Sequence, residues 1–273
     1  MTWELALAMA LLTATPVRAD RPTLRCPMEM ARLGATCVDR WEASLVVVGD
    51  GGARATLSPY RAPSGELRYV AVSRPGVVPQ AHVSMSHAWL ACRRAGKRLC
   101  KADEWVAACR GPADDVWPYG AAREPGRCVD AGRTAPLERL YSGAERFENR
   151  NMNDPRLDQL PNTVARTGEA AGCTNDLGVF DMVGNLNEWI DDTTMRGGFY
   201  LDVIGLGAGC GYATRAHSHV YADYSTGFRC CADATLDDAP ALDAAALIDA
   251  CVAPFEEGAR SLAELLARTT QGS

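Results

Sequence analysis

Cysteine and histidine are the residues of this chain with the most distinctive chemistry. The 273 residues include eleven cysteines and four histidines, the latter at positions 82, 87, 217 and 219. No two cysteines follow the Cys-x-x-Cys spacing, and the histidines lack the paired spacing of a zinc site. His217 and His219 could share one face of a strand, but two surface histidines are the favoured interpretation. We therefore expect no zinc centre, and we expect an odd cysteine to stay free or to bond another chain.

The cysteine count points instead to disulfides, which persist in exported proteins. An apolar run at residues 5–14 is followed by Pro16 and by Val17-Arg18-Ala19, a small-residue pattern that suits signal-peptidase cleavage before Asp20. We interpret residues 1–19 as a signal peptide and expect a secreted or periplasmic product. Because Glu4 stands where a basic residue is usual, a buried N-terminal helix is the alternative. No later segment approaches the ~20 apolar residues of a membrane span, so none is expected.

The overall charge argues against a nucleic-acid binder. The net charge is -6, and no run of Lys or Arg is long enough to form a phosphate-binding stripe. The length fits one large domain or two small ones.

Local patterns predict a loop-rich α+β chain. Residues 44–48 read as a strand, the four prolines of residues 54–82 favour irregular chain, and Ser86 and Gly96 predict the start and stop of a helix. A second helix is expected over 102–110. Turn formers dominate 112–180, and short strand-like runs alternate with glycine over 195–231.

Beyond Ala232 the composition shifts to Ala, Leu and Asp. Two short helical patterns, at 240–252 and 258–268, predict a C-terminal helical extension over 234–273. Its Leu262, Leu265 and Leu266 form an apolar stripe. A helix docked on its own domain is the favoured interpretation, with a partner-binding helix as the alternative.

Six separated segments, read in order, closely resemble the sulfatase-modifying-factor, or formylglycine-generating-enzyme, family. They are residues 92–99 (CRRAGKRL), 103–111 (DEWVAACRG), 117–120 (WPYG), 178–189 (GVFDMVGNLNEW), 196–198 (RGG) and 227–230 (GFRC). The resemblance covers about residues 37–233. It implies one compact domain, which we place at 20–233, with little regular structure and a distant similarity to C-type lectin domains.

The resemblance also implies where the catalytic residues of an active member would lie. Active members hold copper(I) with two cysteines after the Arg-Gly-Gly segment and oxidise a cysteine of a sulfatase Cys-x-Pro-x-Arg motif to formylglycine. Counting from Gly198, those cysteines fall at Asp202 and Gly207. A carboxylate is a hard, poor ligand for copper(I), and glycine offers no side chain, so copper is not expected. Cys210, shifted by a short insertion, is the one remaining candidate, and a disulfide role for it is favoured.

Positions shared with the family suggest the disulfides. The resemblance implies Cys92 with Cys230 and, less directly, Cys109 with Cys210. Cys128 with Cys173 follows from their shared loop region. Cys230 and Cys231 should face opposite ways in a strand and have different partners, which leaves Cys100 with Cys231 as an option.

The segment Asp181–Glu188 matches a calcium segment of the family. The resemblance implies side-chain oxygens from Asp181 and Glu188 and carbonyl oxygens from Gly184 and Leu186; hard oxygen ligands on one bent segment suit a structural calcium ion. A hydrogen-bonded turn capped by Glu188 is the rival interpretation. A second family site is echoed more weakly by Asn151, Met152, Asp158 and Leu160.

Two functions follow as hypotheses. The first is an exported domain that lacks the copper cysteines and acts as a binding or recognition module, in which the loops 112–165 and 199–226 contact an unknown protein or surface ligand. The alternative is an active formylglycine-generating oxidoreductase that uses Cys210. A non-haem-iron enzyme would need a histidine and carboxylate set that the four histidines do not suggest.

Overall fold

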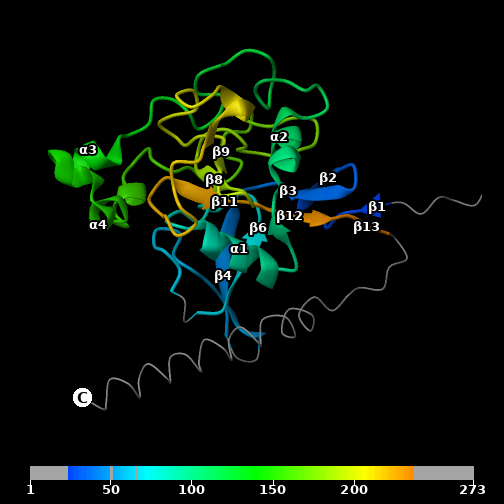
Figure 1. Cartoon of the computed structure of the whole chain (residues 1–273), viewed down its shortest axis with the longest axis horizontal. Helices are drawn as coiled ribbons and strands as arrows, with labels where there is room; N and C mark the ends of the chain where they lie inside the picture. The colour runs from blue at the N-terminus through cyan, green and yellow to red at the C-terminus, as the bar shows by residue number, and fades with distance from the viewer. Residues whose placement is uncertain (1–23, 50–51, 65–66, 237–273) are drawn as a thin grey trace, which may run out of the picture.

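Short strands and two main helices, joined by long irregular segments, build the chain (Figure 1). The computed structural model describes residues 24–49, 52–64 and 67–236. The expected signal peptide, the expected helices at 240–252 and 258–268, and Cys251 lie outside these residues. In the described part no helix is long and apolar enough to cross a bilayer.

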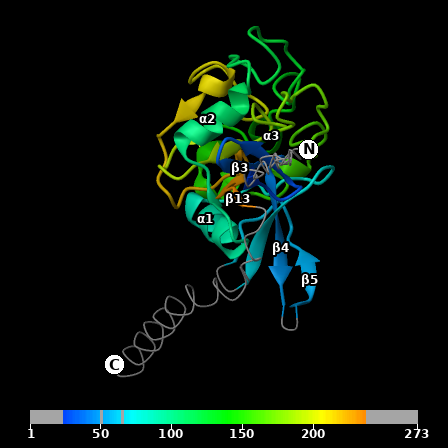
Figure 2. The ribbon, with the colours of Figure 1, turned by 90° about the vertical axis from the view of Figure 1, so that its right-hand side faces the viewer.

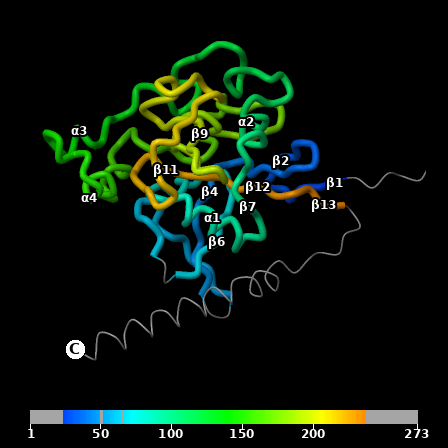
Figure 3. The backbone as a smooth tube through the Cα atoms, viewed as in Figure 1, coloured from blue at the N-terminus to red at the C-terminus, as the bar shows by residue number. Residues whose placement is uncertain are grey.

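Within the described residues the strands form four small sheets. The first has the order β10-β9-β8-β11, the second β2-β3-β12-β7, the third β5-β4-β6, and the fourth joins β1 to β13. Their bounds are β1 Leu24–Arg25, β2 Met30–Leu33, β3 Thr36–Asp39, β4 Ala43–Val48, β5 Arg54–Thr56, β6 Tyr69–Ser73, β7 Arg98–Leu99, β8 Asn187–Trp189, β9 Met195–Arg196, β10 Ala213–Thr214, β11 Thr226–Phe228, β12 Cys230–Asp233 and β13 Thr235–Leu236. In the fourth sheet, Leu24 pairs with Leu236, so the two ends of the described chain lie side by side (Figure 3).

The helices are few and short. They are α1 Met85–Arg94, α2 Ala102–Arg110, α3 Pro136–Leu140, α4 Asn149–Met152 and the 3-10 turns η2 Ala144–Phe147, η3 Leu157–Gln159 and η4 Gly209–Gly211. The prediction of a mixed, loop-rich chain is therefore confirmed.

The expectation of irregular chain over 54–82 is wrong in part. β5 and β6 both pair antiparallel with β4, and the β4–β5 hairpin projects from the rest of the molecule (Figure 2). The prolines that argued against strands lie outside them, at 59, 63, 75 and 79. β6 alternates buried and half-buried residues, so a regular strand forms between the prolines once β4 supplies its hydrogen bonds.

The cap of α1 also differs from the expectation. Ser84, and not Ser86, is the N-cap: its hydroxyl accepts a hydrogen bond from the His87 N–H, while the Ser86 hydroxyl donates to the His219 carbonyl. Only Ser84 has the extended backbone that lets a serine oxygen turn back onto the first helical turn. Gly96, with φ 71°, follows the end of the helix as predicted.

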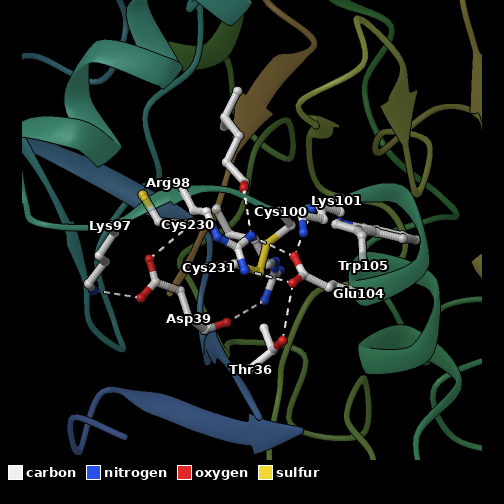
Figure 4. Close-up of a disulfide and its surroundings, with 12 residues drawn as sticks. Thr36, Asp39, Lys97, Arg98, Cys100, Lys101, Glu104, Trp105, Cys230 and Cys231 are labelled. Carbon is white, nitrogen blue, oxygen red and sulfur yellow. Dashed lines mark hydrogen bonds and ion pairs between the residues drawn. A yellow bond between two sulfur atoms is a disulfide. The ribbon is translucent and has the colours of Figure 1, made fainter. Parts of the chain in front are cut away.

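α2 begins without a capping side chain at Lys101. Its substitute is Glu104, which accepts a hydrogen bond from the Lys101 N–H at 2.9 Å and is held by two bonds of 2.7 Å from Arg98 (Figure 4). Glu104 thus supplies the bond from the third helical residue back to the N-cap N–H, while no Lys101 side-chain bond caps the first turn.

Five disulfides tie these elements together. They are Cys26–Cys37, Cys92–Cys230, Cys100–Cys231, Cys109–Cys210 and Cys128–Cys173. The last four are the pairs that the sequence suggested, whereas Cys26–Cys37 was missed. All ten cysteines of the described residues are paired.

Two of the disulfides act on the same pair of chain segments. Adjacent Cys230 and Cys231 of β12 bond to Cys92 in α1 and to Cys100 just after β7, so the second bridge lies close to the first. Figure 4 shows the Cys100–Cys231 bridge with Cys230 beside it. Either bridge alone already brings these segments together.

This geometry predicts non-additive effects on stability. Alone, the 138-residue separation of Cys92 and Cys230 would be worth about 5 kcal/mol of chain entropy. With Cys100–Cys231 intact, Cys92→Ala/Cys230→Ala opens only a loop of on the order of ten residues, so we expect a loss of about 3 kcal/mol. Removing both pairs should cost more than the sum of the two single removals. Urea unfolding without reductant measures each value; a single loss near 5 kcal/mol with additive behaviour would contradict the shared role.

Candidate functional site

The buried guanidinium of Arg229 is the hub of the domain. Arg229, which lies between β11 and β12, is 1% exposed. Its Nε and Nη2 donate to the two carboxylate oxygens of Glu188 at 2.7 and 2.6 Å. Nη1 donates to the Asp39 carbonyl at 3.0 Å, and Nη2 also donates to the Phe180 carbonyl at 2.8 Å. Trp105 of α2 donates its indole N–H to the same Glu188 carboxylate at 2.7 Å. One ion pair therefore joins segments from four parts of the chain.

Two further buried carboxylates lie beside this ion pair. Glu42 accepts hydrogen bonds from the Asn185 side chain at 2.6 Å and from the Leu186 N–H at 3.1 Å. Asp181 accepts one from the Gly168 N–H at 2.6 Å, and its Oδ1 has no hydrogen-bond partner. Burial, reinforced by the neighbouring carboxylates, raises the pKa of Glu42 well above its usual value and that of Asp181 to about 7.

This cluster contains the segment predicted to bind calcium. Asp181 Oδ1 is a free oxygen of the right kind, but Glu188 is committed to Arg229 and Trp105, and a guanidinium beside it would repel a dication. Among the described residues, no three His, Cys, Asp or Glu side chains are placed to hold a metal. In this arrangement the expected ligand set does not fit calcium, because one of its two carboxylates faces a cation. Calcium binding stays a prediction from the resemblance.

The weaker calcium echo is spread over separate contacts. The Asn151 side chain donates to the Glu145 carbonyl, and the Met152 carbonyl accepts from the Tyr224 N–H. Asp158 accepts from the Tyr200 hydroxyl at 3.1 Å, and the Leu160 carbonyl accepts from Thr163.

A buried contact between His82 and Asp158 was not predicted from the sequence. His82 Nε2 lies 3.4 Å from Asp158 Oδ2, and neither side chain is exposed. The two residues are remote in sequence, and Asp158 was assigned only to the weaker calcium echo, so no local signal paired it with His82. The other histidines lie elsewhere: His87 is in α1, His217 stacks on Tyr221, and His219 is exposed.

The loop 199–212 holds the positions where the resemblance places the copper cysteines. Asp202 folds back onto its own loop: Oδ1 accepts from the N–H groups of Ile204 and Gly205 at 3.0 and 2.8 Å, and Oδ2 accepts from the Tyr212 hydroxyl at 3.2 Å. Burial, followed by the Asp202 carboxylate, raises the pKa of Tyr212. Asp202 therefore serves to shape the loop.

Gly207 lies where the backbone excludes a side chain. Its φ is 119°, and a Cβ built on it would lie 2.6 Å from the Gly211 carbonyl oxygen. Cys210, the remaining candidate, is fully buried in its disulfide with Cys109 of α2. The structure thus brings Asp202, Gly207 and Cys210 into one loop but presents no pair of thiols there.

The buried carboxylates predict how stability depends on pH. Between pH 4 and 7 native Asp181 holds a proton that the unfolded chain releases, so the free energy of unfolding should fall as pH rises through this window, by up to about 4 kcal/mol. Asp181→Asn should flatten the slope without removing it, because Glu42 acts in the same direction. Asparagine also tolerates the positive φ of 56° at this position.

Urea unfolding at a series of pH values in a chelator would measure the slope, with the exposed Asp114→Asn as the matched control. An Asp181→Asn slope equal to that of the native chain would contradict the assignment. Repeating the series with calcium tests the calcium prediction separately, since a bound dication would favour ionised Asp181.

Comparison with known proteins identifies the family of the chain. The family model described as "Sulfatase-modifying factor enzyme 1-like domain" matches residues 38–234. No curated protein sequence matches the chain. The matched region runs from β3 to the end of β12 and contains Glu188, Arg229 and the loop 199–212. The chain therefore belongs to the family of sulfatase-modifying factor enzyme 1-like domains.

Proposed function

We propose that this chain is an exported member of the family that lacks copper-dependent cysteine oxidation and acts as a recognition module. The observation that carries the proposal is the state of the loop 199–212. Asp202 is bound within its own loop, Gly207 has no room for a side chain, and Cys210 is tied to Cys109. Copper(I) needs soft thiolates, and this loop offers none.

The disulfides support both the recognition role and export. Five bridges fix a scaffold from which long connections emerge, such as the segment between α2 and β8 and the segment between β9 and β11. Rigid frameworks with long surface loops are well suited to binding, and the bridges within these segments reduce the entropy lost when a ligand is bound. Disulfides of this number are typical of oxidising compartments.

The enzymatic alternative makes an opposite prediction. We expect no formylglycine when the purified chain is incubated with copper(I), oxygen and a Cys-x-Pro-x-Arg peptide, and mass spectrometry of the peptide would detect the product. An active oxidase of the same family, run in parallel, checks the assay. Product above the level given by copper alone would restore the oxidase as the leading function.

Alkylation measures which cysteines are free thiols, independently of any enzymatic activity. After denaturation without reductant, iodoacetamide should modify at most one cysteine, Cys251, because the other ten are paired. Peptide mapping identifies the modified residue. Labelling of Cys210 or Cys109 would show that this bridge is open in the protein.

Restoring the two cysteines by mutation should also fail to restore oxidation. In Asp202→Cys/Gly207→Cys, the new Cβ at position 207 meets the Gly211 carbonyl, so the loop must rearrange before both sulfurs can approach one ion. We expect the double variant to produce no more formylglycine than Asp202→Cys alone. A clear gain in the double variant would mean that the loop adapts easily.

A further inference from the structure

An inner strand of the β10-β9-β8-β11 sheet carries an arginine that forms no ion-pair contact with another described residue. Arg196 of β9 is half-buried, and its buried Nε has no hydrogen-bond partner among the residues that the structure describes. Burial lowers the pKa of Arg196, and the Asp192 carboxylate only partly offsets that effect. A half-buried guanidinium that forms no ion-pair contact keeps its charge at a cost, which a nearby anion would lower.

A second arginine lies close by and is already positioned. Arg215, just after β10, donates from Nε to the Thr194 hydroxyl at 2.8 Å and from Nη2 to Asp192 at 2.9 Å. Its charge disfavours the charge on Arg196. Asp192 acts on the charges of both arginines, but its hydrogen bond goes to Arg215.

The apolar part of the loop 199–212 adjoins this charged group. Leu206 accepts a backbone hydrogen bond from Ala213, and Ala213 pairs directly with Arg196 across the β9–β10 ladder. The side chains of Ile204 and Leu206 are 55% and 54% exposed. Because the Asp202 hydrogen bonds hold this turn in shape, the exposed aliphatic groups lie on a loop that is fixed to the strand next to Arg196.

We propose that Arg196 and Arg215 bind a carboxylate of an acidic peptide segment, and that Ile204 and Leu206 contact an aliphatic side chain next to that carboxylate. The planar guanidinium matches a carboxylate, and an anion bound at the terminal nitrogens would relieve the repulsion between the two cations. Exposed aliphatic side chains beside the charges favour an amphipathic peptide over an inorganic ion. The inference rests on the proposed recognition function and names its binding face and ligand class.

Binding of a minimal peptide tests the proposal. The probe is N-acetyl-Leu-Asp-Leu-amide, titrated into the full chain and followed by ligand-observed NMR, with the Asn analogue as its matched control. We expect a millimolar dissociation constant for the Asp peptide and about tenfold weaker binding of the Asn analogue. Arg196→Met and Arg215→Gln should each weaken the Asp peptide about tenfold, whereas Arg93→Gln in α1 should have no effect. Equal binding of the two peptides, or binding that survives both arginine substitutions, would overturn the proposal.

Stability and competition separate this role from a structural one. Arg196→Met should unfold at the same urea concentration as the native chain or a higher one, because it removes an unpaired half-buried cation. A large loss of stability would show that Arg196 is a structural residue and would count against the proposal, leaving the exposed Arg215→Gln to decide the binding question.

Ile204→Ala/Leu206→Ala should weaken binding of the Asp peptide but leave competition by inorganic sulfate unchanged. If sulfate binds as tightly as the peptide and the aliphatic substitutions have no effect, the site takes oxyanions alone and the peptide assignment is wrong. Formylglycine production in the same samples would overturn the recognition role separately.

Discussion

The ion pair between Arg229 and Glu188 is the interaction on which the rest of the domain depends. A domain with so little regular structure cannot rely on long helices or wide sheets, and its long irregular segments must find partners for their backbone groups. Arg229 supplies such partners to the carbonyls of Asp39 and Phe180 while it neutralises Glu188. Breaking the pair from one side would leave a buried charge uncompensated, which typically costs several kcal/mol.

The disulfides connect the segments around this ion pair to one another. Cys109–Cys210 connects α2, whose Trp105 contacts Glu188, to the turn η4 at the end of the loop 199–212. The cysteine that could have served a metal thus serves the scaffold instead. The same bridge fixes one end of the loop while Asp202 shapes the other, and the outcome is a rigid loop with exposed aliphatic groups and no available thiols. The absence of free thiols at the expected copper positions and the fixed shape of the loop 199–212 therefore have the same cause.

The elements and positions that follow from local sequence patterns could be predicted from the sequence. The two main helices, the strand after Ala43 and the substitutions at 202 and 207 follow from capping residues, β-branched runs and the spacing after Arg196–Gly198. β6 was missed because the four prolines around it were given more weight than its own strand-forming Tyr69, Val70 and Val72, and because its partner β4 lies more than twenty residues earlier. The Cys26–Cys37 bridge was missed because Cys26 lies before the region of family resemblance, and the contact of Glu188 with Arg229 was hidden because each residue belongs to a different motif. The lack of room for a side chain at Gly207 could not be predicted either, since nothing in the sequence shows how near the Gly211 carbonyl lies.

The most direct test of this account is a competition for copper(I). The Cys251→Ser variant would be titrated against a chromogenic copper(I) chelator, so that only the ten paired cysteines of the domain remain. We predict that the protein leaves the metal with the chelator, because no thiolate is available in the loop 199–212. Withdrawal of one equivalent of copper(I), lost again in Cys210→Ser, would contradict the account and return the domain to the copper-dependent oxidases of its family.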